Sequence, residues 1–195
     1  VGSDTTWNTV DAGANIGIAT KTDGTLWAWG NNFHGQLGQN VQNISASSPV
    51  QVGALTTWQS AIVGLNNWYA VKSDGTAWVC GQNSYGTLGI NDAVNRSSPV
   101  QLGASNDWYL FAGSQGATTC FAIKTDGTLW SWGRNSSGNL GQNDTINRSS
   151  PTQIGSLTTW QHVSSAFDGG FAVKTDGTLW AWGAGALGVL GQNNE

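Results

Sequence analysis

The chain repeats one unit of about fifty residues four times, and this repetition constrains its fold more than any other feature. A tryptophan, an Asp-Gly pair and a Leu-Gly pair recur once in each unit. Repeats of this length indicate a solenoid, an array or a propeller, in which each unit is stabilised by its neighbours. The recurring positions are Trp7, Trp58, Trp108 and Trp160; Asp23, Asp74, Asp126 and Asp176; and Leu37, Leu88, Leu140 and Leu190.

Each unit has the pattern of short β-strands. Apolar side chains alternate before and after Lys-Thr-Asp-Gly-Thr, over 18–21 and 26–29 in the first unit. Asp-Gly between two such runs predicts a hairpin with a type I′ turn. A strand that begins near Trp7 and another after Pro49 complete the unit. A four-stranded sheet cannot bury both faces alone, so we predict an all-β fold, a β-propeller built from four-stranded antiparallel blades.

We predict a single domain over residues 1–195, either a propeller or a segment of one. Both chain ends fall inside the repeating unit, which favours a piece cut from a longer array. The alternative is a complete small domain that closes as a four-bladed ring or by self-association. The predicted repeats span 3–53, 54–103, 104–155 and a truncated 156–195.

The unit resembles the repeat of the regulator-of-chromosome-condensation family. The resemblance rests on residues 23–38, which read DGTLWAWGNNFHGQLG, on their three copies, and on Asn-Arg-Ser-Ser-Pro at 95–99 and 147–151. It covers essentially the whole chain and implies a β-propeller, which in this family typically has seven blades. The family includes an exchange factor for a small GTPase and a plant ultraviolet photoreceptor, so the resemblance alone does not define a function.

The composition excludes several functional classes. Charged residues make up 9% of the chain, against roughly 25% in typical soluble domains. The net charge is −4 with only 7 Lys and Arg, so we predict no nucleic-acid partner, because phosphate binding needs clustered cations. No apolar run approaches the 18 residues of a membrane span, so we predict no membrane insertion.

The sequence offers no convincing catalytic group, and we predict no enzyme activity, no cofactor and no metal. His34 and His162 occupy non-equivalent positions and are interpreted as surface residues. The repeated Asp of Asp-Gly suits a turn, where its short side chain makes local hydrogen bonds. The loops 91–95 and 143–147 offer oxygen ligands for calcium but lack a bidentate Glu. We instead expect Arg96 and Arg148 to hold these loops to an Asp or a carbonyl.

Eleven of the twelve tryptophans occupy three equivalent positions, and Trp68 alone is out of register. Four of them recur in every unit and are interpreted as core: Trp27, Trp78, Trp130 and Trp180. Trp68 lies in the segment that varies most among the repeats, residues 11–17, 63–69, 113–120 and 166–170. Variable segments on a fixed scaffold are where recognition usually occurs. The predicted ligand contacts, to a protein or a glycan, are therefore Trp68, Tyr69, Asn66 and Asn67.

The two cysteines allow two interpretations. Cys80 and Cys120 lie in adjacent repeats, and neighbouring blades could bring them together as a disulfide. The alternative is two buried free thiols.

We interpret the chain as a non-catalytic scaffold that displays variable loops. Its low charge and its Asn, Thr and Gly content favour a virion protein, such as a phage fibre or decoration, or a bacterial surface adhesion module. The expected location is therefore extracellular or on a virion surface. The alternative is an intracellular propeller regulator, exchange-factor-like or inhibitor-like, that binds a partner protein through one face. The partner classes are a protein or a glycan, with self-association as a route to complete the ring.

Overall fold

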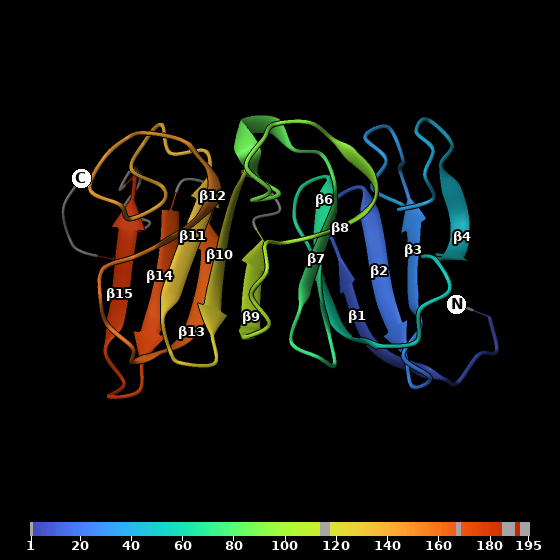
Figure 1. The fold of residues 1–195 in the computed structure, drawn as a ribbon, viewed down its shortest axis with the longest axis horizontal. Helices are drawn as coiled ribbons and strands as arrows, with labels where there is room; N and C mark the ends of the chain where they lie inside the picture. The colour runs from blue at the N-terminus through green and yellow to red at the C-terminus, as the bar shows by residue number, and fades with distance from the viewer. Residues whose placement is uncertain (1, 114–117, 167–168, 185–189, 192–195) are drawn as a thin grey trace.

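Four antiparallel sheets make up the described part of the protein. The computed structural model describes residues 2–113, 118–166, 169–184 and 190–191, and within these ranges the all-β prediction is confirmed (Figure 1). The first sheet contains β1 (Trp7–Ala12), β2 (Ile16–Lys21), β3 (Leu26–Gly30) and β4 (Ala46–Gln51). The second contains β5 (Trp58–Val63), β6 (Asn67–Lys72), β7 (Ala77–Gly81) and β8 (Arg96–Gln101), with the short 3₁₀ helix η1 (Ser84–Gly86) between β7 and β8.

The third and fourth sheets repeat this order. The third contains β9 (Trp108–Gly113), β10 (Thr119–Lys124), β11 (Leu129–Gly133) and β12 (Arg148–Gln153). The fourth has three strands among the described residues, β13 (Trp160–Ala166), β14 (Gly169–Lys174) and β15 (Leu179–Gly183). In every sheet, strands that follow each other in the chain are neighbours.

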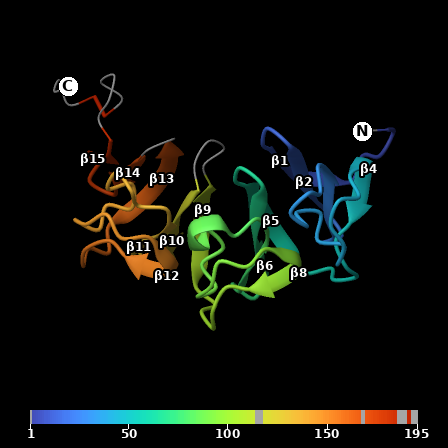
Figure 2. The same cartoon turned by 90° about the horizontal axis from the view of Figure 1, so that it is seen from above.

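The sheets lie side by side in an arc, with the first and the fourth at its two ends (Figures 1 and 2). The first strands of successive sheets, β1, β5, β9 and β13, contact one another and form the inside of the arc. One rim of the arc, here called the loop rim, carries the long loops 31–45, 82–95 and 134–147. The opposite rim, the turn rim, carries the Asp-Gly turns. No helix of the described residues is long and apolar enough to cross a bilayer.

The Asp-Gly turns differ from the predicted type I′ geometry. Gly24 has a φ of 78°, whereas Asp23 is not among the residues with positive φ. The amide of Gly24 donates to the carbonyl of Lys21, and the amide of Lys21 donates to the carbonyl of Thr25. This is a three-residue hairpin loop that ends in a left-handed glycine. The hairpin prediction is therefore right and the turn type is wrong.

The fourth strand of the first three sheets begins before its proline rather than after it. Pro49 lies inside β4, and Pro99 and Pro151 occupy the same place in β8 and β12. Each of these strands is at the outer edge of its sheet. An edge strand tolerates proline, because the missing N–H can face away from the neighbouring strand.

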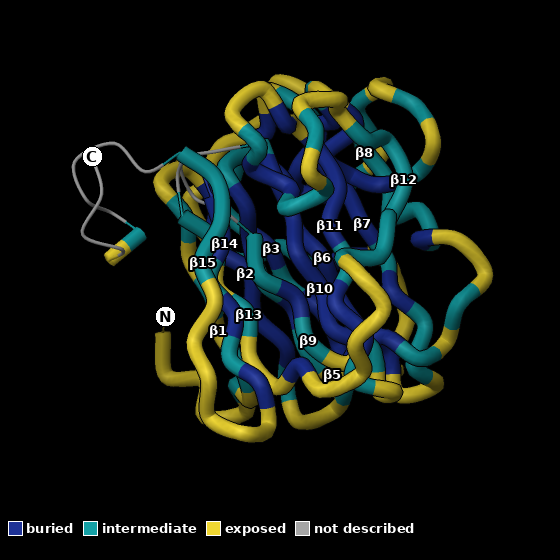
Figure 3. The backbone as a smooth tube through the Cα atoms, turned by 90° about the vertical axis from the view of Figure 1, so that its left-hand side faces the viewer, coloured by how far each residue is buried: buried dark blue, intermediate teal, exposed yellow. Residues whose placement is uncertain are grey.

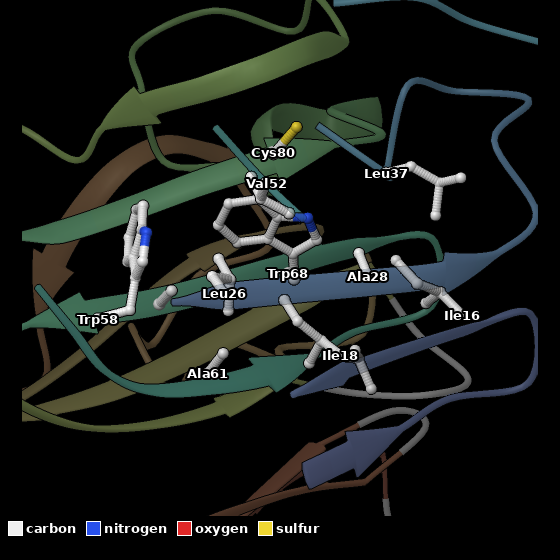
Figure 4. Close-up of a cluster of buried hydrophobic side chains, with 12 residues drawn as sticks. Ile16, Ile18, Leu26, Ala28, Leu37, Val52, Trp58, Ala61, Trp68 and Cys80 are labelled. Carbon is white, nitrogen blue, oxygen red and sulfur yellow. The ribbon is translucent and has the colours of Figure 1, made fainter. Parts of the chain in front are cut away.

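The hydrophobic core lies between the sheets. The first cluster joins Ile18, Leu26 and Ala28 of the first sheet to Trp58 and Trp68 of the second (Figure 4). A second cluster joins the second and third sheets, and a third joins the third and fourth. Neighbouring sheets thus bury their facing apolar surfaces against each other, as the repeat pattern predicts.

Candidate binding surface

The repeated Asp-Gly-Thr-X-Trp segment forms a chain of local hydrogen bonds. Asp23 Oδ1 accepts bonds from the amide and the hydroxyl of Thr25, at 2.9 and 2.7 Å. The Thr25 hydroxyl oxygen accepts a 2.8 Å bond from Trp27 Nε1. The same bonds recur in the other three sheets. The hydroxyl and then the amide of Thr25 hold the pKa of Asp23 below its ordinary value. These aspartates are structural turn residues, as predicted.

A lysine lies between two indole rings in each sheet. Lys21 Nζ is 4.8 Å from the Trp7 ring centroid and 4.1 Å from that of Trp27. Such cation–π contacts hold the second indole at the surface of the sheet. Trp78 and Trp130 are half-buried and pack against the core clusters, which agrees with their interpretation as core, whereas Trp27 is half-buried outside these clusters and Trp180 is 49% exposed, so the interpretation is wrong for Trp180.

Trp68 is buried rather than exposed. Its side chain is 0% exposed, and its Nε1 donates a 2.8 Å hydrogen bond to the carbonyl of Gln36 in the preceding sheet. Two in-register tryptophans make the equivalent bond to the preceding sheet: Trp132 donates to Thr87 O and Trp182 to Asn139 O. The interpretation of Trp68 as an exposed contact is therefore wrong, because this indole anchors one sheet to the next.

Trp68 and Cys80 form a cross-strand pair in which the large and the small residue have exchanged strands relative to the other sheets. Trp68 on β6 lies opposite Cys80 on β7. In the first sheet the order is reversed, with Gly17 opposite Trp29. A Cβ built on Gly17 would collide with the indole of Trp29, so only one large side chain fits at this pair. The small residue at the position equivalent to Trp68 in the other sheets, Gly17, Cys120 or Gly170, was the sequence signal of this exchange.

Of the other predicted contacts, only Asn66 reaches the loop rim. Tyr69 and Asn67 are buried, and the Tyr69 hydroxyl donates a 2.5 Å bond to Thr87 O, while burial raises the pKa of this phenol. Asn66 is half-buried: its Oδ1 accepts a 3.2 Å bond from Asn15 Nδ2, and its Nδ2 donates to Gln82 Oε1 at 3.0 Å. Two parts of the variable segment, 114–117 and 167–168, lie outside the described residues.

The two cysteines are buried free thiols, which agrees with the second interpretation and excludes the disulfide. Cys80 belongs to the core between the first and second sheets, and Cys120 to the core between the second and third. Cys80 Sγ donates to the carbonyls of Gly35 and Arg96. Burial raises the pKa of the Cys80 thiol to about 12 and also raises that of Cys120, so neither ionises readily.

The long loops of the second and third sheets are held by the predicted arginines. Arg96 binds the Asp92 carboxylate and the Val94 carbonyl. Asp92 Oδ1 also accepts bonds from Asn83 Nδ2 and the Val94 amide, at 2.8 and 2.9 Å. Asp144 and Arg148 form the same arrangement in the third sheet. These contacts occupy the oxygens considered for calcium. No group of three metal-ligating side chains occurs among the residues that the structure describes.

An aromatic and cationic patch on the loop rim was not predicted. Tyr85, in η1, is 51% exposed, and the Arg134 guanidinium carbon lies 5.7 Å from the centre of its ring. Phe33 of the first sheet is also exposed and makes an edge-on contact with His34. His34 is half-buried and His162 is exposed, which agrees with their interpretation as surface residues.

Tyr85 has an unusual backbone for a bulky residue. Its φ is 59°, and every other described non-glycine residue with positive φ is an asparagine: Asn40, Asn43, Asn91 and Asn143. Asparagine tolerates this region, whereas an aromatic residue in it is strained by about 1 kcal/mol or more. We therefore take Tyr85, Arg134 and the polar groups of Asn15, Asn66 and Gln82 as the candidate surface. No sequence pattern marked Tyr85, because its equivalents are His34 and Ser137.

Solved propellers have the same fold as this chain. Prp20p from Saccharomyces cerevisiae is similar with a TM-score of 0.82 and 22% identity, over 100% of this chain and 50% of that one. Human WBSCR16 is similar with a TM-score of 0.81 and 20% identity, over 91% of this chain and 47% of that one. The predicted β-propeller class is thus confirmed, and the chain spans about half the length of these structures.

Curated relatives are much longer proteins. The human E3 ubiquitin-protein ligase HERC2 is 29% identical over 156 residues, which are 78% of this chain and 3% of that protein. The Arabidopsis thaliana Ultraviolet-B receptor UVR8 is 29% identical over 147 residues, 74% of this chain and 33% of that one. These relatives and Prp20p are intracellular proteins, so the prediction of an extracellular or virion location is wrong.

Family models match nearly the whole described chain. The Regulator of chromosome condensation (RCC1) repeat matches residues 23–68, 74–121 and 126–173, and a second model of the same repeat matches residues 7–36. The first three of these matches cover more than half of the chain and include the Asp-Gly-Thr segments of the first three sheets, the anchoring indoles Trp68 and Trp132, and the proline-bearing edge strands. The chain belongs to the regulator of chromosome condensation repeat family.

Proposed function

We propose that this chain is a non-enzymatic scaffold that binds a partner protein through its loop rim. The observation that carries the proposal is Tyr85, an exposed aromatic ring in a strained backbone conformation with an arginine over its face. Tyrosine and arginine are enriched among the residues that dominate protein interfaces. Backbone strain persists where the surroundings enforce it, and it is common at binding sites.

The relatives support a protein-binding role. The published structures of Prp20 concern its complex with Kap60 and its binding properties to Gsp1p and histones. The ligase activity of HERC2 does not extend to this chain, because the match covers 3% of that protein. These relatives favour the intracellular-regulator alternative over a virion or adhesion role, and they offer no support for a glycan ligand or for self-association.

The test is site-directed photocrosslinking in the cell that makes the protein. A photoreactive phenylalanine replaces Tyr85 in one variant and Tyr109 in another, because Tyr109 is also an exposed tyrosine and lies on β9 near the turn rim. We expect a discrete polypeptide adduct from position 85 that disappears when Arg134→Ser is added, and none from position 109. Equal adducts from both positions, or none from position 85, would reject the loop rim as the interface.

Purified proteins then give the strength of the interaction. The captured polypeptide, and Gsp1p and histones as the first defined probes, are titrated by calorimetry. Truncation of an interface hot spot costs about 2 kcal/mol or more of binding free energy, so Tyr85→Ser should raise the dissociation constant by about thirtyfold. Tyr109→Ser is the matched control and should leave the dissociation constant unchanged.

A further inference from the structure

Each lysine that lies between two indole rings on the turn rim is here called a lysine cage. The cages differ in whether a carboxylate of the same chain forms an ion pair with the lysine. In the first sheet, Lys21 Nζ lies 2.7 Å from Asp4 Oδ2. In the third sheet, Lys124 Nζ lies 3.0 Å from Asp107 Oδ1. The two acids come from different places, because Asp4 is three residues before its tryptophan and Asp107 is one residue before its own. Acids at two different positions of the repeat therefore form an ion pair with the equivalent lysine.

The cage of the second sheet has the rings and the cation but no acid. Lys72 Nζ lies 3.6 Å from the Trp78 ring centroid and 4.9 Å from that of Trp58. The positions equivalent to Asp4 and Asp107 are Leu55 and Thr57, neither of which is acidic. The Lys72 ammonium makes no hydrogen bond and no ion pair in the part of the chain that the structure describes.

The Lys72 side chain is also buried. The residue is 7% exposed, so little of its side chain faces water, and its ammonium has no carboxylate as a partner among the described residues. Burial lowers the pKa of Lys72, and the nearby Asp74 only partly opposes this shift. Asp74 does not fill the gap, because no ion pair joins it to Lys72 among the described residues, and its Oδ1 accepts bonds from the amide and the hydroxyl of Thr76.

The backbone around the three cages is the same. The amide that follows the lysine donates to the residue before the tryptophan: Thr22 to Thr6, Ser73 to Thr57 and Thr125 to Asp107. An acid at position 55 or 57 of the second sheet would therefore reach Lys72, as Asp4 reaches Lys21 and Asp107 reaches Lys124. In the third sheet the cage opens onto a cleft of about 450 Å³ between the second and third sheets, lined by Trp108, Lys124 and Trp130.

We propose that the Lys72 cage is a docking site for an acidic side chain of a partner polypeptide, which supplies the carboxylate that Asp4 and Asp107 supply in the neighbouring sheets. The carboxylate accepts charge-assisted hydrogen bonds from the ammonium, while Trp58 and Trp78 hold that ammonium in place. The cage of Lys174 in the fourth sheet has the same features, because the positions equivalent to Asp4 and Asp107 are Leu157 and Thr159 and no ion pair joins Lys174 to a carboxylate among the described residues, so the same occupant is expected there. The site lies on the turn rim, so it is independent of the loop-rim function proposed above.

The test uses a capped hexaglutamate peptide as the probe and ¹³C-labelled lysine in the whole chain. We expect the NMR signal of the Lys72 side chain to shift on titration, and a capped hexaglutamine peptide to leave it unchanged. Leu55→Asp supplies an internal acid at the position of Asp4, and should weaken hexaglutamate binding about tenfold, the loss expected for one charge-assisted hydrogen bond. Leu55→Asn is the matched control and should bind like the wild type.

Two further variants test the reasoning from the repeats. Asp107→Asn removes the internal acid of the third sheet, so the Lys124 signal should begin to respond to hexaglutamate. Lys72→Met should abolish the response at this site, and its melting curve shows whether the sheet still folds. Tyr85→Ser should not change hexaglutamate binding, which separates this result from the loop-rim experiment.

Three outcomes would overturn the proposal. The first is a Lys72 signal that hexaglutamate does not move at millimolar concentration. The second is equal binding by the wild type and Leu55→Asp. The third is tighter binding of inorganic phosphate than of hexaglutamate at Lys72, which would make the cage a site for a free anion instead of a protein side chain.

Discussion

Equivalent residues have different environments in the inner sheets and at the ends of the arc. Leu129 of the third sheet is 0% exposed under the fourth sheet, whereas Leu179, its equivalent in the fourth, is 68% exposed. At the other end, Trp132 is buried against the second sheet, and its equivalent Trp29 is only half-buried. Figure 3 faces the fourth sheet, where β15 is exposed or intermediate along its length. The same side chain is thus core or surface according to its neighbouring sheet.

The local hydrogen bonds do not follow this division. The Asp-Thr-Trp bonds of the turns are present in the end sheets and in the inner sheets alike. Contacts within a hairpin therefore depend on the repeat alone, and contacts between sheets depend on position in the arc. Each prediction below compares an inner residue with its equivalent elsewhere.

The largest contrast is expected at the anchoring indoles. Trp132→Ala removes a buried ring and its bond to Thr87 O, and should lower the free energy of unfolding by about 3–5 kcal/mol. Trp29→Ala should cost about 1 kcal/mol, because no second sheet of the described residues covers this half-buried ring. Denaturant unfolding of both variants measures the difference. Equal losses would show that the end sheet depends on this indole as much as the inner sheet does.

The exchanged pair of the second sheet gives a second large effect. Trp68→Gly alone should lower the free energy of unfolding by about 3–5 kcal/mol, because it removes the only large side chain of the pair. Adding Cys80→Trp recreates the Gly17–Trp29 arrangement of the first sheet and should recover at least half of this loss. A double mutant no more stable than Trp68→Gly would contradict the interpretation that the large side chain can come from either strand of this pair. Chemical denaturation of the single and double mutants provides the comparison.

The equivalent leucines Leu129 and Leu179 test the same difference between inner and end sheets with a smaller side chain. Leu129→Ala should cost about 2–5 kcal/mol, the usual range for a buried leucine. Leu179→Ala should change the free energy of unfolding by about 0.5 kcal/mol or less, as at exposed sites. Thermal and urea unfolding measure both. A large loss at Leu179 would mean that another surface covers this face in solution.

The turns should give the smallest effect, equal in inner and end sheets. Threonine hydrogen bonds lower the pKa of Asp126 and of Asp176 in the folded protein. Their contribution to stability is therefore complete above the ordinary carboxyl pKa of about 3.9 and is lost as the pH falls through the folded values. Asp126→Asn and Asp176→Asn should each make the melting temperature less sensitive to pH below 4, by the same amount. Unequal changes in melting curves between pH 2 and 6 would contradict a local origin.

The sequence alone determined the features that lie within one repeat. The alternation of apolar residues specified the strands, and Asp-Gly-Thr specified the hairpin and its hydrogen bonds, because these partners are two to four residues apart. The family resemblance, carried by residues 23–38 and their copies, is confirmed by the family match. The turn type escaped the analysis, because both hairpin classes use glycine at the same place.

Tertiary structure decided which side chains are buried and which remain on the surface. Trp68 looked like a displaced surface ring because its partners, Cys80 across the strand and Gln36 in the preceding sheet, are 12 and 32 residues away in the chain. Alternation states that a residue faces one side of a sheet, but not whether another sheet covers that side. Tyr85, Lys72 and Leu179 acquire their character from such neighbours, because burial depends on the assembled arc rather than on the repeat.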